Sequence, residues 1–205
     1  MWSAQVKQTL KAHIAAGQCH GIAGRGQDQL ITALIARLRD TFRIGVIEGR
    51  HQHLMTRRPS RAGHPQRGAQ HGRRLPHRGD EHSEDPSGIQ LDALDVLFVE
   101  NIGNLVCPAE FDIGENLRIT ILSVPEGDDK VEKYPLMFTE TDCLVLNKAD
   151  VLPYFDFDLE RVKENYHGVN PGAPLFAVSA RSEEGLDALC AHLRERFVQL
   201  LDETR

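Results

Sequence analysis

Five short, continuous apolar runs recur along this chain, and segments with helical spacing alternate with them. The helical patterns cover residues 30–40, 158–166 and 183–201. Continuous apolar runs of this length are typical of strands buried on both faces of a sheet. Their alternation with helices predicts a three-layer α/β fold with a mainly parallel sheet, and 205 residues suit a single domain, 1–205. The five runs are 43–49 (RIGVIEG), 95–101 (DVLFVEN), 117–124 (LRITILSV), 142–147 (DCLVLN) and 175–179 (LFAVS).

Net charge, apolar run lengths and cysteine content indicate which classes of protein this chain does not resemble. The net charge of −6 argues against a nucleic-acid binder, and no apolar run reaches the ~20 residues that span a bilayer. The N-terminus, residues 1–17, has no secretory hydrophobic region. Four scattered cysteines, Cys19, Cys107, Cys143 and Cys190, do not form a disulfide framework. We therefore expect a reduced, cytoplasmic protein that contacts neither membrane nor nucleic acid.

One segment departs from this pattern. Between Arg50 and His82 lie eight arginines and six histidines, with only Asp80 and Glu81 acidic. The segment has neither a helical nor a strand period, and its composition is that of a disordered tract. A structureless stretch this long is unusual inside a compact domain, so residues 50–83 require a separate explanation.

Two motifs follow consecutive predicted strands. Asn147-Lys148-Ala149-Asp150 overlaps the end of the run 142–147, and Ser179-Ala180 ends the run 175–179. An aspartate at the first place can accept hydrogen bonds from N1–H and the exocyclic amine of guanine, a donor pair that adenine lacks. Lys148 can lie along the base, Asn147 can tie neighbouring loops, and a backbone N–H near Ala180 can meet the guanine O6. The alternative is a turn with an Asx cap on the next helix; the strand before the motif and the second motif favour guanine binding.

A third motif follows the run 95–101. Glu100 is the candidate catalytic residue and is expected beside nucleotide phosphates and Mg²⁺, since ligands bind at the carboxyl ends of such strands. Cys107 is a candidate soft ligand for Zn²⁺ or Ni²⁺. A lone cysteine is more often a small buried hydrophobe.

Together these stretches resemble the hydrogenase nickel-incorporation GTPases (HypB-like). The resemblance rests on FVENIGNLVCPAEFDIGE, LSVPEGDDKVEKYPLMF, LNKADVLPYFDFD and VSARSEEGLD, and it runs from about Leu91 to the C-terminus with a further piece at 30–49. It implies a P-loop GTPase that uses GTP and Mg²⁺ and inserts nickel into the large subunit of a [NiFe]-hydrogenase. It also implies a homodimer with metal, Ni²⁺ or Zn²⁺, at its interface, and two partners: the large-subunit precursor and a zinc- or nickel-binding accessory maturation protein.

The phosphate loop that the resemblance requires is altered. A loop of the form GxxxxGK[ST] should precede the helix at 30–40. The chain has Gly24, Gly26, Gln27 and Asp28 at the corresponding positions, without the lysine. Arg50 stands where an aspartate is expected after Glu-Gly, and an expected Cys-His pair is missing.

A shift of the reading frame, in which each codon is read from its second base, would explain these departures from the family pattern. The third base of most codons is not determined by the encoded residue and can be chosen to suit the shifted frame. With such choices, the shifted frame can encode SPGAGKT over residues 22–28 and DINT over 50–53. It can also encode a run that contains Gly-Gly-Cys-His over 63–80. The same shift gives a stop at Met55, so more than one base change is needed. Coincidence is the alternative, but three separate recoveries of expected motifs favour compensated frameshifts at about 19–29 and 50–83.

Other interpretations remain open. The histidines of 50–83 could store nickel, although the frameshift accounts for them without a function. An RNA-binding tract is disfavoured, because the rest of the chain is acidic and no aromatic residues are interleaved. A chain that keeps the guanine pocket without the phosphate loop would be a catalytically dead metallochaperone homologue. A urease-type nickel-insertion GTPase is a closer rival, and the run ENIGNLVCP favours the hydrogenase branch.

Overall fold

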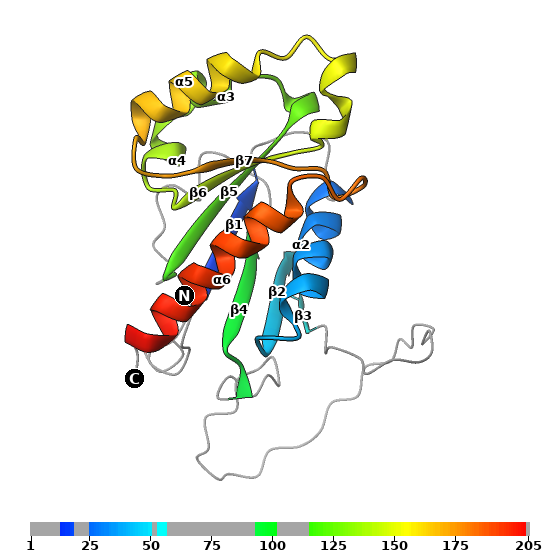
Figure 1. The fold of residues 1–205 in the computed structure, drawn as a ribbon, viewed down its shortest axis with the longest axis vertical. Coiled ribbons are helices and arrows are strands. Elements are labelled where there is room, and N and C mark those ends of the chain that lie inside the picture. Colours follow the sequence, from blue (N-terminus) through cyan, green and yellow to red (C-terminus); the bar gives the residue numbers. More distant parts are fainter. Residues whose placement is uncertain (1–12, 19–24, 51–52, 57–92, 102–114, 204–205) are drawn as a thin grey trace.

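The computed structural model describes residues 13–18, 25–50, 53–56, 93–101 and 115–203. Over these residues it is an α/β fold around one seven-stranded sheet (Figure 1). The strands are β1 (His13–Gln18), β2 (Ile44–Arg50), β3 (His53–Thr56), β4 (Val96–Asn101), β5 (Leu117–Ser123), β6 (Cys143–Asn147) and β7 (Leu175–Ala177). The helices are α2 (Arg25–Leu38), α3 (Lys130–Lys133), α4 (Pro135–Thr139), α5 (Leu159–Val169) and α6 (Leu186–Glu203), with short 3-10 turns η3 (Val124–Glu126) and η4 (Ala149–Tyr154).

The sheet has the strand order β3-β2-β4-β1-β5-β6-β7. Every neighbouring pair is parallel except β2 with β3, which is antiparallel. The mainly parallel α/β sheet expected from the sequence is therefore confirmed. Because the strands are parallel, their carboxyl ends share one edge, where open α/β sheets bind ligands.

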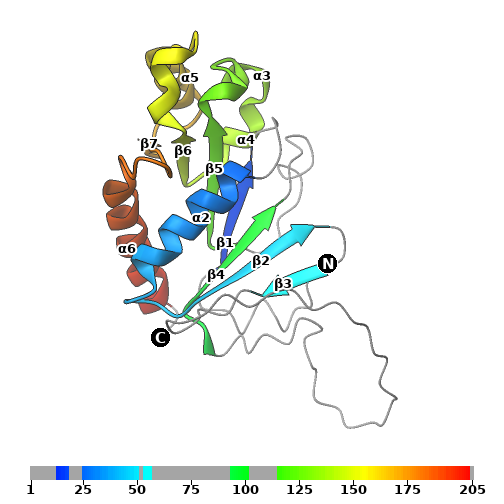
Figure 2. The same ribbon diagram turned by 90° about the vertical axis from the view of Figure 1, so that its right-hand side faces the viewer.

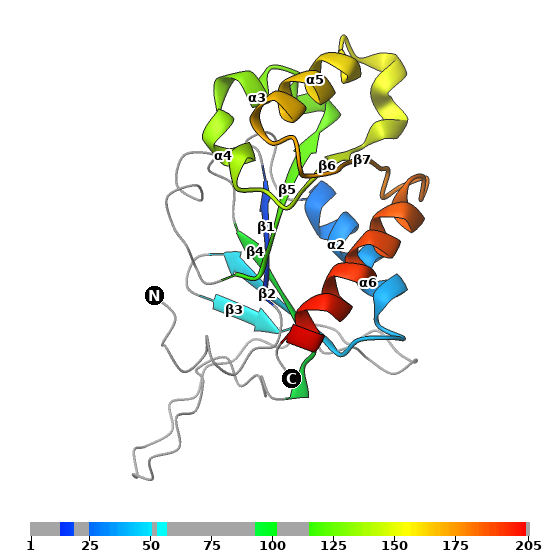
Figure 3. The same ribbon diagram turned by 60° about the vertical axis from the view of Figure 1, so that its left-hand side comes forward.

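Helices cover both faces of the sheet, which gives the three layers (Figures 1 and 3). Helices α2 and α6 pack side by side on one face, and α3, α4 and α5 lie together on the other. The strand β6 shows why its sequence is continuously apolar. Cys143 and Val145 join the cluster under α2 and α6, whereas Leu144 and Leu146 join the cluster under α4 and α5. All four side chains are completely buried.

Most predicted elements appear within a few residues of their expected ends, but two strands were missed. The first is β1, which pairs with β4 and β5 at the centre of the sheet. The second is β3, seen beside β2 in Figure 2. It lies in the segment 50–83, so the expectation that this segment has no strand is wrong at His53–Thr56; its remainder from residue 57 lies outside the described residues.

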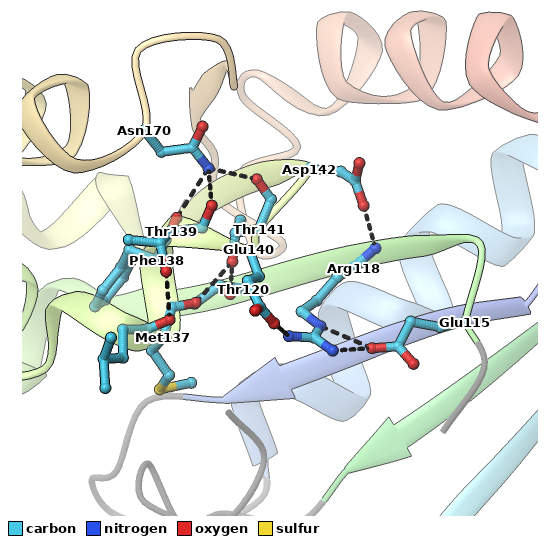
Figure 4. Close-up of polar contacts among 11 residues, drawn as sticks. Glu115, Arg118, Thr120, Met137, Phe138, Thr139, Glu140, Thr141, Asp142 and Asn170 are labelled. Atoms are coloured by element: carbon cyan, nitrogen blue, oxygen red, sulfur yellow. Dashed lines mark hydrogen bonds and ion pairs between the residues drawn. The ribbon is translucent and has the colours of Figure 1, made fainter. Parts of the chain in front are cut away.

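Polar side chains secure the opposite edge of the sheet, where β5 and β6 begin (Figure 4). The backbone N–H of Arg118 donates to Asp142 Oδ2 at 2.6 Å, and the N–H of Asp142 donates to the Arg118 carbonyl at 2.9 Å. The Arg118 guanidinium also pairs with Glu115 and Glu140. These contacts fix the register of the two strands, whose far ends carry the candidate site.

Among the helices that the structure describes, none is long and apolar enough to cross a membrane.

Candidate functional site

The motif Asn147-Lys148-Ala149-Asp150 lies where β6 ends, at the carboxyl edge of the sheet. Asn147 is the last residue of the strand and is buried, with 1% of its surface exposed. Its Oδ1 accepts a 2.8 Å hydrogen bond from the N–H of Lys148. Lys148 has φ 62° and ψ 38°, a left-handed conformation that is unusual outside glycine. The turn directs the chain abruptly from the strand into η4, whose first turn contains Asp150.

The second motif lies in the loop between β7 and α6, residues 178–185, which we call the base loop. Ser179 is fully buried, and its Oγ accepts hydrogen bonds from the N–H groups of Arg181 at 3.2 Å and Ser182 at 3.0 Å. The N–H of Ser179 donates to the Glu184 carbonyl at 2.9 Å. These three bonds close the base loop on itself, so the Ser179 hydroxyl is committed to the loop's own structure.

Backbone hydrogen bonds join these two motifs. The N–H of Ala149 donates to the Val178 carbonyl at 2.9 Å, and the N–H of Val178 donates to the Leu146 carbonyl at 2.8 Å. The structure thus brings Asn147, Lys148 and Asp150 next to Ser179 and Ala180, although about 30 residues separate the two motifs. Two loops joined at one edge can present a carboxylate and backbone N–H groups to the same edge of a base.

Glu100 lies along the same edge, near the end of β4. It is buried, with 8% of its surface exposed, and it is in register with Ala16 of β1 and Glu48 of β2. The central strand β1 ends at Gln18, and α2 begins at Arg25. A strand followed within a few residues by a helix is the element order in which phosphate loops occur, and residues 19–24 between them lie outside the described residues.

The sequence positions assigned to the phosphate loop lie partly inside and partly outside the described residues. Gly26, Gln27 and Asp28 lie in the first turn of α2, which therefore begins earlier than the predicted start at residue 30. Gly24 and Cys107 lie outside the described residues. The structure therefore gives a fold position to three of these residues and leaves the metal assignment to Cys107 on the sequence alone.

The described part of the chain does not bring a set of metal-ligating side chains together. No group of three or more His, Cys, Asp or Glu side chains there could hold a metal ion. Cys143 and Cys190 are free and buried, and burial raises the pKa of the Cys143 thiol to about 12. A thiol that stays protonated is a poor metal ligand, so neither residue extends the candidate site.

One side-chain contact to the base loop was not predicted from the sequence. Arg37 of α2 donates from Nη2 to Glu183 Oε2 at 2.8 Å. The two residues are 146 positions apart. Local spacing carries no signal for such a pair, and each residue by itself resembles an ordinary charged side chain on a helix or in a loop.

Comparisons with known proteins identify the family of this chain. The sequence model described as the CobW/HypB/UreG nucleotide-binding domain matches residues 73–177, just over half of the chain. The chain is 39% identical to the hydrogenase maturation factor HypB of Escherichia coli K12 over 165 residues, which are 80% of this chain and 57% of that protein. The chain thus spans little more than half the length of this relative.

Two solved structures share the fold. The HypB structure from Archaeoglobus fulgidus superposes with a TM-score of 0.68 at 28% identity, over 93% of this chain and 94% of that one. The HypB structure from Helicobacter pylori in complex with nickel superposes with a TM-score of 0.65 at 26% identity, over 95% of this chain and 90% of that one. The chain therefore belongs to the CobW/HypB/UreG nucleotide-binding family, is HypB-like within it, and has the P-loop GTPase fold.

Proposed function

We propose that this chain, in the form that carries an intact phosphate loop, is the guanine-nucleotide domain of a factor that delivers nickel to the large subunit of a [NiFe]-hydrogenase, with delivery coupled to GTP hydrolysis. The observation that carries the proposal is the joined pair of loops at the carboxyl edge of the sheet. Asp150 would accept from N1–H and the amine of guanine, and the backbone N–H of Ala180 would donate to O6, since the N–H of Ser179 already donates to the Glu184 carbonyl. Lys148 would lie along the base, while Asn147 holds the turn.

The phosphate side of this site is incomplete in the 205-residue chain. Gln27 and Asp28 stand where the loop needs a lysine and a hydroxyl side chain. The Asp28 carboxylate would lie at a place that receives a highly negative triphosphate. The donor set of the 205-residue chain consequently does not fit a Mg²⁺–triphosphate complex, and a catalytic role for Glu100 would require the restored loop.

Nucleotide binding by two chains tests the proposal. One is the 205-residue chain, and the other is a loop-restored chain that carries the residues of the shifted frame. We expect GTP hydrolysis from the loop-restored chain only, and we expect it to prefer GDP over ADP. Equal turnover from both chains would overturn our interpretation of the loop, and equal affinity for GDP and ADP would overturn the guanine site. The restoring substitutions are Ile22→Ser, Ala23→Pro, Arg25→Ala, Gln27→Lys and Asp28→Thr.

An inactive metallochaperone homologue is the second candidate, and the altered residues at 27 and 28 favour it. Such a chain would keep metal binding without turnover. A urease-type nickel-insertion GTPase is the other alternative. Reconstitution with hydrogenase and urease apoproteins, each assayed for nickel incorporation, separates the two substrates.

Nickel is the proposed cargo because the structure from Helicobacter pylori, which this fold resembles, holds nickel. Cys107 would contribute one thiolate, and tight Zn²⁺ or Ni²⁺ sites need about three or four ligands. The 205-residue chain should therefore bind Ni²⁺ weakly. A chain restored over both 22–28 and 50–83 should bind about one ion per dimer, and Cys107→Ala should abolish that site without changing GDP affinity. Unchanged nickel affinity in the alanine variant would exclude Cys107 as a ligand.

The proposed setting is a cytoplasmic homodimer that closes on GTP and loosens after hydrolysis. Its proposed partners are the hydrogenase large-subunit precursor and a zinc- or nickel-binding accessory protein. Sedimentation of the loop-restored chain with GDP and with a non-hydrolysable GTP analogue tests the dimer. Identical sedimentation in both states would contradict nucleotide-controlled closure.

A further inference from the structure

Arg37 links the helix that follows the phosphate-loop position to the base loop. Its side chain is 23% exposed, and its guanidinium lies 2.8 Å from Glu183 Oε2 and 3.5 Å from Asp187 Oδ1. Nη1 also donates to the Ala33 carbonyl at 3.5 Å within α2. One guanidinium thus contacts α2, the base loop and the first turn of α6.

The loop residue that Arg37 holds has an unfavourable backbone conformation. Glu183 has φ 66°, in the left-handed region that residues with a Cβ rarely adopt. Gly185 follows with φ 72°, where a glycine is well suited. The conformation at Glu183 therefore requires support from the rest of the structure.

This backbone conformation closes the base loop. The carbonyl of Glu184, directly after Glu183, accepts from the N–H of Ser179. The carbonyl of Glu183 accepts from the N–H of Leu186, where α6 begins. A change at Glu183 would therefore displace both the Ser179 end of the loop and its junction with the helix.

We propose that Arg37 is a positioning residue for base recognition, which acts by holding Glu183 in its left-handed conformation. The backbone N–H of Ala180, next to the Ser179 N–H that closes the loop, is then held where the guanine O6 would be read. This inference rests on the proposed guanine site. A purely structural ion pair between α2 and α6 is the competing interpretation, and it would change the stability of the fold without changing base selectivity.

The first test uses the loop-restored chain and two ligands, GDP and the diphosphate of 2-aminopurine riboside, which lacks O6. Arg37→Met should weaken GDP binding by roughly three- to fivefold, the range of one partly exposed ion pair. Binding of the analogue should not change. The matched control is Arg194→Met, because Arg194 Nη2 donates to the Arg37 carbonyl at 2.8 Å and joins the same helices, and among the described residues it has no hydrogen bond or ion pair to the base loop. Equal losses for both ligands, or equal losses in the control, would overturn the inference.

A double-mutant cycle tests the route through Glu183. Glycine adopts a left-handed conformation without support, and it also lacks the carboxylate that Arg37 contacts, so Arg37→Met should have no further effect on GDP affinity in a Glu183→Gly background. Additive effects of the two substitutions would show that Arg37 does not act through the backbone of Glu183.

A third measurement separates this inference from the proposed function, because it needs no nucleotide. In the 205-residue chain, Arg37→Met should speed hydrogen exchange of the Arg181 and Ser182 N–H groups several-fold, while Arg194→Met should not. Unchanged exchange would overturn the positioning role even if GDP binds. Failure of the loop-restored chain to prefer GDP over ADP, with faster exchange in the variant, would overturn only the base-reading step.

Discussion

The backbone N–H of Ala149 lies 2.9 Å from the carbonyl oxygen of Val178 and donates a hydrogen bond to it. This bond joins the turn after β6 to the base loop after β7. Because the bond uses backbone atoms only, substitutions of either side chain leave it intact. The two loops should therefore keep their relative position when a single side chain of either motif is replaced, which makes side-chain variants informative.

Asp150→Asn should change the base preference of the loop-restored chain. The amide offers a donor where the guanine amine also donates, whereas xanthine carries an acceptor there. We expect GTP affinity to fall by about a hundredfold or more and xanthosine triphosphate to become the better ligand. Competition binding with both nucleotides measures this. Equal losses for the two would remove Asp150 from base recognition.

Gly185→Ala should destabilise the fold by about 2 kcal/mol or more. Gly185 has φ 72°, and a Cβ there would lie 2.2 Å from the Ala177 carbonyl oxygen. The matched control is Gly168→Ala in α5, where a Cβ would meet nothing within 4 Å. That change should stabilise the fold by about 0.5 kcal/mol, since alanine is the better helix former. Urea unfolding of both variants provides the comparison, and similar effects of the two would contradict the strained turn.

Asn170→Ala should lower the free energy of unfolding by about 1–3 kcal/mol. The Asn170 Nδ2 donates to the carbonyls of Phe138 at 2.9 Å, Thr139 at 3.3 Å and Thr141 at 2.7 Å (Figure 4). Its loss leaves these acceptors, which end α4 and lead into β6, without that donor. Asn165→Ala is the control, since its amide contacts the exposed carboxylate of Glu132. Denaturant midpoints of the two variants should differ clearly.

Asp129 should make the folded state sensitive to acid. Hydrogen bonds from Lys130 and Lys133 lower the pKa of this carboxyl to about 2. A carboxyl whose folded pKa is depressed contributes stability above its unfolded pKa of about 3.9, and this contribution is lost as pH falls toward 2. The unfolding free energies of the native chain and Asp129→Asn should therefore differ at about pH 7 and converge near about pH 2. A difference that is constant with pH would contradict this linkage.

Several features were predictable because their signals are local. The continuous apolar run at β6 requires burial on both faces, and Leu144 and Val145 indeed face opposite clusters. The motif around Asp150 and the one around Ser179 each follow a strand, so a parallel sheet necessarily brings them to one edge. The spacing of the motifs along the chain was therefore enough to predict that the two motifs lie side by side.

Other features depend on pairing between distant segments. β1 has the sequence HIAAGQ, which carries no strong strand pattern, yet it lies between β4 and β5 and pairs with both. Its place at the centre is determined by two neighbours that offer unpaired N–H and C=O groups along their edges. β3 is likewise defined by its antiparallel pairing with β2, and its own histidine-rich surroundings predicted no strand.

The sequence by itself determined the fold class, the family and the two motifs that meet at the carboxyl edge of the sheet, because apolar periodicity and short motifs are properties of neighbouring residues. Only the tertiary structure decided that Ala149 bonds to Val178 and that Arg37 of α2 reaches Glu183. Such contacts join residues whose separation along the chain bears no relation to their distance in space. They form only after the sheet has aligned its strands and packed α2 against α6, so no local pattern can encode them.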